Sequence, residues 1–395
     1  MFKIFSKQNK RVYLDYAAAS PNLISLPAEY QESFENPSAI YKEGLKVNDI
    51  INKCRADILK NFDAVSQRII FLNSATQSIN VALQGSLESG DHLIISAVEH
   101  PAVLECAKFL EREKGVELTV LPVNEFGLID IKLLRENLKP NTKLVSIIYA
   151  NNETGTVQPI KEIGRSISEY NRENNTKILF HTDATQAINY LEVRMGSNRL
   201  DMISFNSSKI YAGKGSAALI YNKTLKLKPI IFGGGQENNL WSGTESLDGI
   251  LRLSLSIADI NDTKSKNHRD KEALRLNILK SYFLKEIQKE IGEVILWSKA
   301  ENSLPNIINI GLPNFESDEM VIRLDELGFA VSHKSACAAT ESSSGSYVLQ
   351  AIGSTVKQSS ENIRISMGRG TTKKEMEALI KAIKLTYYKF AKSAK

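Results

Sequence analysis

Between about residue 65 and residue 225, short β-branched or apolar runs alternate with segments of helical periodicity. The runs are RIIFL, HLIIS, LTVLPV, LVSIIYA, KILFHTD and MISFN, and the segments with apolar spacing of three and four include QSINVALQGSLES, PAVLECAKFLEREK and IKEIGRSISEYNREN. This alternation predicts βαβ units and therefore an α/β fold with a mostly parallel sheet covered by helices. In such sheets, ligands bind at the carboxyl ends of the strands.

The length of the chain predicts more than one domain. At 395 residues it exceeds the size at which a single core keeps growing. After GGGQENNLWSGTES the pattern changes to long charged helices, most clearly in LSIADINDTKSKNHRDKEALRLNILKSYFLKEIQKEIG. We therefore predict a large α/β domain over residues 16–262 and a smaller α+β domain over residues 263–395, to which residues 1–15 belong.

Composition and patterning exclude several classes of protein. The three cysteines, Cys54, Cys106 and Cys337, are widely spaced and form no CxxC, which excludes a disulfide framework or zinc ribbon and favours a reducing cytoplasm. The net charge is only +5 and its cations are scattered among anions, so we expect no nucleic-acid partner. No apolar run approaches the roughly 18 residues of a membrane span, and the charged N-terminus does not read as a signal peptide.

Two strand ends carry polar residues with two possible interpretations each. KILFHTDATQA brings Asp183 from a buried strand into a turn, where it is either a helix N-cap or a carboxylate that pairs with a cationic ligand atom. MISFNSSKIYAGKG places Lys209 just beyond the next strand. A loop lysine is usually solvated, but at the mouth of an α/β crevice it can form a Schiff base.

A third strand end predicts a phosphate site. IIFLNSATQS predicts a strand, a small polar turn and then a helix, so the amides of Ala75 and Thr76 are expected at a helix N-terminus, where they can bind phosphate. A turn of this composition is common, so by itself it is weak evidence for a phosphate site. Together with Asp183 and Lys209 it describes a pyridoxal phosphate site, in which the carboxylate keeps the ring nitrogen protonated and the lysine holds the aldehyde.

One cysteine lies in an unusual setting. Cys337 stands in SHKSACAATESSSGSYVL, a run of small and hydroxylated residues that predicts a solvated loop, whereas cysteines are usually buried. Cys54 and Cys106 lie in apolar helical patterns, and we interpret both as core residues.

The chain resembles the NifS/IscS-type cysteine desulfurases of the class V aminotransferase group over nearly its whole length. The resemblance rests on these segments, in this order: YLDYAAASP, NPSAIYKEG, SAVEHPAVL, YANNETGTVQPI, HTDATQA, SSKIYAGKG, GGGQENNLWSGT, SACAAT and IRISMGRGTT. It implies the fold type I of pyridoxal-phosphate-dependent transferases, with a seven-stranded, mostly parallel sheet in the large domain and the cysteine loop in the small one.

The resemblance also implies roles around the cofactor ring. Lys209 would hold the aldehyde, Asp183 would pair with the ring nitrogen, and Gln186 would bond the ring hydroxyl. His100 would stack on the ring and move protons, although a lone histidine is more often a hydrogen-bonded structural residue.

Further implied roles concern phosphate and substrate. Ala75 and Thr76 would bind phosphate, and Thr244 would reach in from a second subunit, so the resemblance implies a homodimer. Asn152 would contact the ring hydroxyl and the substrate, and Arg364 would clamp the substrate carboxylate in a bidentate pair.

Several positions depart from the pattern of that family. Ser208 stands where relatives usually have His, Asn206 where they have Ser, and Trp241 where they tend to have Arg. Further departures are Ser74, Gln77 and Tyr41. Ser208 and Asn206 lie at the phosphate end of the predicted site. Each charge-assisted bond to phosphate that these replacements remove is worth about 1.5–3 kcal/mol, so we hypothesise that the cofactor binds more weakly.

The implied activity is removal of sulfur from L-cysteine, which gives L-alanine and a persulfide on the nucleophile Cys337. The acceptor would be an iron–sulfur scaffold or a tRNA-thiolation protein, and no metal is implied. Alternatives are another class V aminotransferase, a selenocysteine or cysteine-sulfinate lyase, or a non-catalytic dimeric scaffold whose cofactor site has decayed. Retention of Lys209, Asp183, His100, Arg364 and Cys337 argues against the scaffold.

Overall fold

The computed structural model describes residues 11–30, 35–299, 301–333 and 345–390. Its largest sheet has seven strands. In spatial order they are β2 (Arg68–Leu72), β8 (Ala217–Tyr221), β7 (Met202–Asn206), β6 (Leu179–Asp183), β5 (Thr142–Ser146), β3 (His92–Ser96) and β4 (Glu117–Leu121). All neighbouring strands are parallel except β8, which is antiparallel to β7 and β2. The predicted seven-stranded, mostly parallel sheet is confirmed.

The runs RIIFL, HLIIS and MISFN coincide with β2, β3 and β7. The run AALIY, which forms β8, is absent from the predicted strands because its two alanines give a weak β signal. PAVLECAKFLEREK and IKEIGRSISEYNREN coincide with α3 (Pro101–Lys114) and α5 (Ile160–Asn174).

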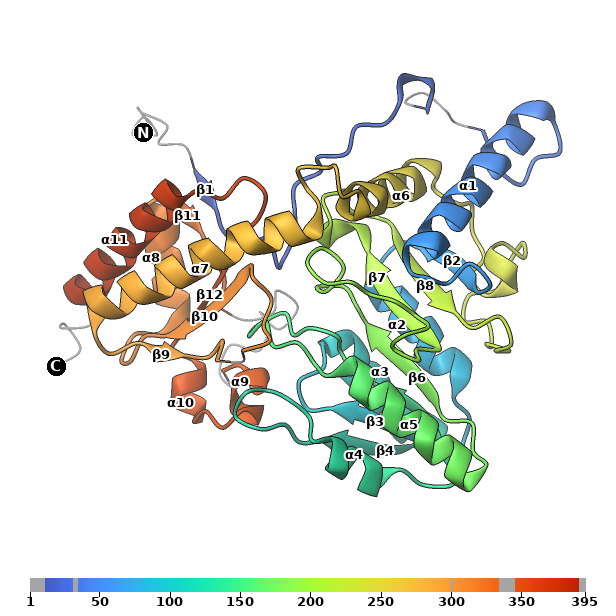
Figure 1. Cartoon of the computed structure of the whole chain (residues 1–395), viewed down its shortest axis with the longest axis horizontal. Coiled ribbons are helices and arrows are strands. Elements are labelled where there is room, and N and C mark those ends of the chain that lie inside the picture. The colour runs from blue at the N-terminus through green and yellow to red at the C-terminus, as the bar shows by residue number, and fades with distance from the viewer. Residues whose placement is uncertain (1–10, 31–34, 300, 334–344, 391–395) are drawn as a thin grey trace.

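Helices cover both faces of this sheet, as Figure 1 shows. On one face, α2 (Ala75–Ser86) and α3 share a core with alternate strand residues such as Leu93 and Ile95. On the other face, Ile94 and its counterparts join a larger core with α1 (Lys42–Asn61), α5 and α6 (Leu247–Asn261). The alternation follows from the two-residue period of a strand.

A smaller α+β part contains the remaining strands. β9 (Ile295–Leu296), β10 (Ile307–Gly311) and β12 (Asn362–Ser366) form an antiparallel sheet with β10 in the centre. The helices of this part are α7 (Arg269–Ile291), α8 (Ser317–Glu326), α9 (Tyr347–Ala351), α10 (Val356–Ser359) and α11 (Lys373–Phe390). The short helix α4 (Ile131–Asn137) belongs to the large sheet, beside α5.

The N-terminal segment crosses to the smaller part, because β1 (Val12–Tyr13) pairs in parallel with β11 (Phe329–Ala330). The chain returns along α7, a long helix that extends from the large sheet across the smaller part (Figure 1). The predicted domain boundary at residues 262 and 263 falls between α6 and α7, and it stays a prediction.

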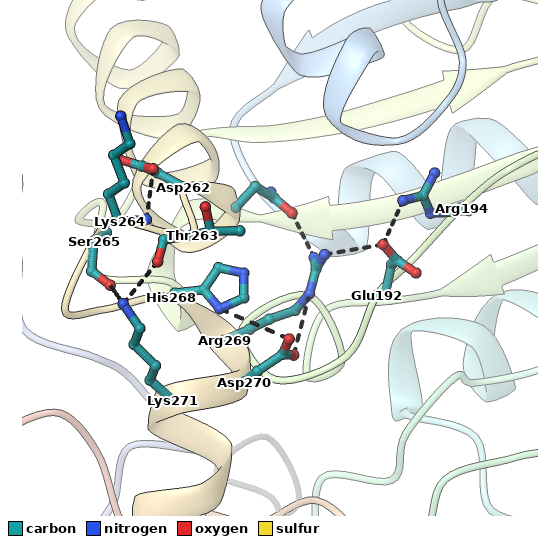
Figure 2. A network of polar contacts seen from close by, with 11 residues as sticks. Glu192, Arg194, Asp262, Thr263, Lys264, Ser265, His268, Arg269, Asp270 and Lys271 are labelled. Carbon is teal, nitrogen blue, oxygen red and sulfur yellow. Dashed lines mark hydrogen bonds and ion pairs between the residues drawn. The ribbon is translucent and has the colours of Figure 1, made fainter.

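The connection from α6 to α7 interrupts the charged helical pattern of that stretch. Asp262 and Ser265 hydrogen-bond locally, which competes with helix formation: Asp262 accepts from the amide of Lys264 at 2.9 Å. Figure 2 shows how charged side chains hold this connection. Arg269 donates to Asn261 at 2.5 Å and pairs with Glu192 at 3.2 Å, so the start of α7 is tied to α6 and to the segment after β6.

Cys54 on α1 and Cys106 on α3 are both buried, as predicted. Burial raises the pKa of Cys106 to about 12, and it raises that of Cys54 as well. The nucleophilic thiolate is therefore scarce at both sites near neutral pH.

We predict that iodoacetamide at pH 8 leaves Cys54 and Cys106 unmodified in the native protein, because both thiols are buried and protonated. Peptide mapping by mass spectrometry measures this, and unfolding in guanidinium before labelling is the control that should expose both. Modification of native Cys106 as fast as in the unfolded chain would contradict the described packing of α3.

Candidate active site

A cavity of about 200 Å³ opens at the carboxyl ends of the parallel strands, where the sequence predicts a ligand. The segments that follow β2, β3, β5, β6 and β7 all contribute to its wall. The lining residues are Ala17, Ala18, Ser74, Ala75, Thr76, Ile79, His100, Ala102, Ile148, Ala150, Asn152, Asp183, Thr185, Gln186, Asn206, Lys209 and Arg364. Most of the predicted site residues thus meet in one cavity.

Asp183 is the last residue of β6, and its side chain is buried in the cavity wall. Its Oδ1 accepts from the amide of Thr185 at 3.0 Å, which closes a turn rather than capping a helix. The helix N-cap interpretation of Asp183 does not apply here, and its pairing with a cationic ligand atom stays a prediction. Gln186 lies next to it and donates from Nε2 to the carbonyl of Ala17 at 2.9 Å.

Lys209 follows β7 in a 3₁₀ turn over Ser207–Lys209. Its side chain lines the cavity, and its Nζ donates to the carbonyl of Ala18. Lys214, the other lysine of this loop, is exposed. Lys209 is thus partly buried at the cavity wall, and its role as a Schiff-base lysine stays a prediction.

The predicted phosphate turn lines the same cavity. Ser74 caps α2, since its Oγ accepts from the amide of Gln77 at 3.3 Å, and Ala75 and Thr76 in the first turn line the cavity. A helix N-terminus attracts anions through its amides and its dipole. Asn206 lines the same cavity, whereas Ser208 does not and instead donates to Oδ1 of Asn206 at 3.2 Å.

His100 has both a structural and a cavity-facing position. Its Nδ1 accepts from the amide of Ala102 at 3.1 Å and so caps α3. This bond leaves the proton of the neutral ring on Nε2. Burial lowers the pKa of His100; the carboxylate of Asp183 opposes this shift and the ammonium of Lys209 adds to it. His100 is therefore uncharged at neutral pH, close to both groups.

Arg364 comes from β12, in the smaller part of the chain, and completes the wall. It is almost fully buried, its Nη1 donates to the carbonyl of Asn152 at 3.0 Å, and its Nη2 pairs with Asp15 at 2.8 Å. Its Nε is buried with no hydrogen-bond partner among the described residues. A buried donor of this kind fits an anionic ligand group.

Of the predicted site residues that the structure describes, Ser208 and Thr244 do not line this cavity. Thr244 lies in a separate small depression with Trp241, beside Phe71. Cys337 lies outside the described residues.

Sequence reasoning missed two carboxyl groups beside the cavity. Asp15 contacts Arg364, which is 349 residues away, so no local pattern reveals the pair. Glu99 precedes His100; its Oε1 accepts from Ser96 Oγ at 2.5 Å and from the amide of Ile148 at 2.9 Å. Burial raises the pKa of Glu99 to about 8, so it is protonated at neutral pH. An acidic residue inside the apolar run before His100 is the signal that could have identified it.

The arrangement fits pyridoxal phosphate by its chemistry. A helix N-terminus suits the phosphate, the buried carboxylate of Asp183 suits the ring nitrogen, and Lys209 suits the aldehyde.

Among the described residues, no group of three or more His, Cys, Asp and Glu side chains could hold a metal ion. None of the described helices is long and apolar enough to cross a membrane.

Comparisons with known proteins agree with this chemistry. The model of the family "Aminotransferase class-V" matches residues 12–379. Cysteine desulfurase IscS of Dictyoglomus turgidum is 37% identical over 375 residues, which are 93% of this chain and 92% of that protein.

Two solved structures are similar. The NifS-like protein from Rickettsia africae has a TM-score of 0.83 at 28% identity, covering 95% of this chain and 99% of that one. SspA in complex with cysteine has a TM-score of 0.74 at 31% identity, covering 90% and 98%. The chain therefore belongs to the class V aminotransferase family, in its group of NifS/IscS-type cysteine desulfurases.

Proposed function

We propose that this protein removes the sulfur of L-cysteine, releases L-alanine, and carries the sulfur as a persulfide on Cys337 to an acceptor protein. The observation that carries the proposal is the meeting of Lys209, Asp183, His100 and Arg364 in one cavity. The membership of the family and the similarity to a protein solved in complex with cysteine support the choice of substrate.

Pyridoxal phosphate, when bound, supplies a cationic ring that accepts the electron pair of the substrate's Cα–H bond. The amides of Ala75 and Thr76, with Asn206 beside them, hold its phosphate, and Asp183 keeps the ring nitrogen protonated. Gln186 and Asn152 hold the ring hydroxyl.

Lys209 would hold the aldehyde of the cofactor, and its amine, when free, would take the Cα proton of the substrate. His100 moves a proton through Nε2, the nitrogen that does not cap α3. General acid–base catalysis by Lys209 and by His100 should each raise the reaction rate about 10²–10⁴-fold. Arg364, which lines the cavity, binds the substrate carboxylate.

The proposed role of Cys337 is supported by the two described ends of its segment. Ser332 pairs through its main chain with Arg364. At the other end, Ser346 donates to Glu153 at 2.5 Å, next to Asn152, and Tyr347 donates to the carbonyl of Glu99 at 2.5 Å, next to His100. Both ends therefore lie beside residues of the cavity wall.

In the sulfur step, the thiolate of Cys337 attacks the substrate Sγ. The S–S bond forms as the Cβ–Sγ bond breaks, and Cβ takes a proton to become the methyl group of alanine. The two sulfur atoms are oxidised and Cβ is reduced, so the step needs no external oxidant.

The second subunit and the acceptor belong to the same proposal. Thr244 lies outside its own chain's cavity, which fits a residue that completes the phosphate site of a homodimer partner. Phe232, in the same segment, is 81% exposed. An iron–sulfur scaffold or a tRNA-thiolation protein as acceptor, and a cytoplasmic location, stay predictions.

The direct test is to mix the purified protein with L-cysteine and a reductant and to measure alanine and sulfide together. Equal amounts of both products support the desulfurase. Alanine formed only when a keto acid is present, without sulfide, would indicate an aminotransferase instead.

We predict that the cofactor is bound to Lys209, because this lysine lines the cavity beside Asp183 while Lys214 is exposed. Borohydride reduction followed by peptide mapping should place the label on Lys209. The control is Lys214→Ala, which should keep the label. Label on Lys214 in the unaltered chain would overturn the assignment.

We predict that Cys337→Ser abolishes both alanine and sulfide but leaves cofactor binding intact, because the serine cannot accept sulfur and the ring contacts are unchanged. The absorption spectrum on addition of L-cysteine checks that substrate still binds. Cys54→Ser is the matched control and should keep activity. Undiminished product formation by Cys337→Ser would contradict the desulfurase mechanism and favour an aminotransferase.

We predict that Ser208→His tightens cofactor binding, because an imidazole near Asn206 adds a charge-assisted bond to phosphate worth about 1.5–3 kcal/mol. Equilibrium dialysis of the two apoproteins measures the change, which should be about tenfold or more. Ser207→Ala, at a buried serine of the same turn that bonds the carbonyl of Ser216, is the control for changes in turn packing. Equal affinities would show that position 208 does not act on the phosphate.

A further inference from the structure

Arg364 is paired before any substrate arrives. Its side chain is 1% exposed, and the Asp15 carboxylate accepts from its Nη2 at 2.8 Å. A buried cation without a counter-ion is strongly unfavourable, so Asp15 stabilises Arg364 in this position.

The main chain of Asp15 is held separately from its side chain. Its carbonyl accepts from the amides of Ala18 and Ala19, at 3.0 and 3.2 Å, and from the hydroxyl of Tyr13 at 3.0 Å. These bonds form the turn whose Ala17 and Ala18 line the cavity. A change confined to the Asp15 carboxyl group therefore leaves the turn and its contact with Lys209 in place.

Asp15 contacts the guanidinium of Arg364 without lining the cavity itself. Arg364 lines the cavity, whereas Asp15 is absent from its described lining and its side chain is 21% exposed. The buried Nε, which has no partner among the described residues, and the second protons of Nη1 and Nη2 remain as donors. A substrate carboxylate on these donors would share the guanidinium with Asp15.

We propose that Asp15 sets the affinity of the site for amino-acid carboxylates: it is a permanent counter-ion that limits how tightly Arg364 holds substrate and product. This inference rests on the proposed role of Arg364. Asp15 acts through Arg364 and is therefore a positioning residue, not a catalytic one.

The sign of the effect follows from the charges. Two carboxylates on one guanidinium repel each other, and a unit-charge repulsion over a few ångströms at a partly buried site is enough to change a dissociation constant by about tenfold or more. Replacement of Asp15 by Asn keeps an oxygen that accepts from Nη2 and removes the charge. The incoming carboxylate then becomes the counter-ion of a buried cation, so its binding is strengthened.

The test is to titrate the holoenzyme with L-alanine and with L-alaninol, which lacks the carboxylate, and to follow the absorption of the bound cofactor. Asp15→Asn should lower the dissociation constant of L-alanine and the KM of L-cysteine by about tenfold, and leave L-alaninol unchanged within about twofold. Asp15→Ser should act in the same direction if the first variant folds poorly. Damage to the fold would weaken binding, so tighter binding cannot come from it.

Asp259→Asn is the matched control. Asp259 pairs with Arg369 at 3.1 Å, with side-chain exposures of 27% and 9%, and neither residue lines the cavity. The Asp259→Asn variant should leave the affinities for L-alanine and L-alaninol unchanged.

Unchanged or weaker L-alanine binding by Asp15→Asn, with weakened binding by Arg364→Lys, overturns the inference and leaves the proposed role of Arg364 standing. Unchanged L-alanine binding by Arg364→Lys overturns that role itself. Equal tightening for L-alanine and L-alaninol would show that Asp15 does not act on the carboxylate.

Discussion

Hydrogen bonding between parallel strands is the constraint on which this site depends. Because β3, β5, β6 and β7 run in one direction, the segments that follow them leave the sheet at one edge. His100, Asn152, Asp183 and Lys209 are far apart in the chain, yet each lies at or after the end of one of these strands and meets the others in one cavity. A slip of one residue in any strand would turn its last side chain to the other face of the sheet. The pairing register of the strands therefore decides which side chains face the cavity.

Buried polar side chains inside the sheet fix that register below Asp183. His181 on β6 bonds Ser146 on β5 at 2.8 Å and Ser204 on β7 at 2.9 Å, and Ser78 on α2 donates to Ser204 at 2.7 Å. Burial lowers the pKa of His181 to about 3, so the ring is neutral and can donate from one nitrogen while it accepts at the other. An apolar core would tolerate sliding of neighbouring strands, whereas this chain of bonds is complete in one register only.

Much of the large sheet could be predicted from sequence, because β2, β3 and β7 are compact β-branched or aromatic runs bounded by turns. β8 is alanine-rich and lacks this signal, and the break between α6 and α7 comes from local bonds of Asp262 and Ser265 that periodicity does not reveal. Around the cavity, residues at strand ends could be predicted to line a ligand site from their place in the alternation of strands and helices. The pairs formed by residues distant in the chain, such as Asp15 with Arg364, could not, because they depend on how the smaller part lies against the sheet.

The structural and the functional interpretation of a residue need not exclude each other. His100 caps α3 through Nδ1, and this bond is what leaves Nε2 as the protonated nitrogen. Glu99 supports the same turn through its bonds with Ser96 and Ile148, and as an uncharged acid it adds no negative charge beside Asp183. The side chains of opposite charge type at the site come in pairs, with Lys209 and Asp183 in one cavity wall and Arg364 on Asp15 at 2.8 Å. A zwitterionic amino acid adds one charge of each sign to these pairs, so it can bind without leaving an uncompensated charge in a buried site.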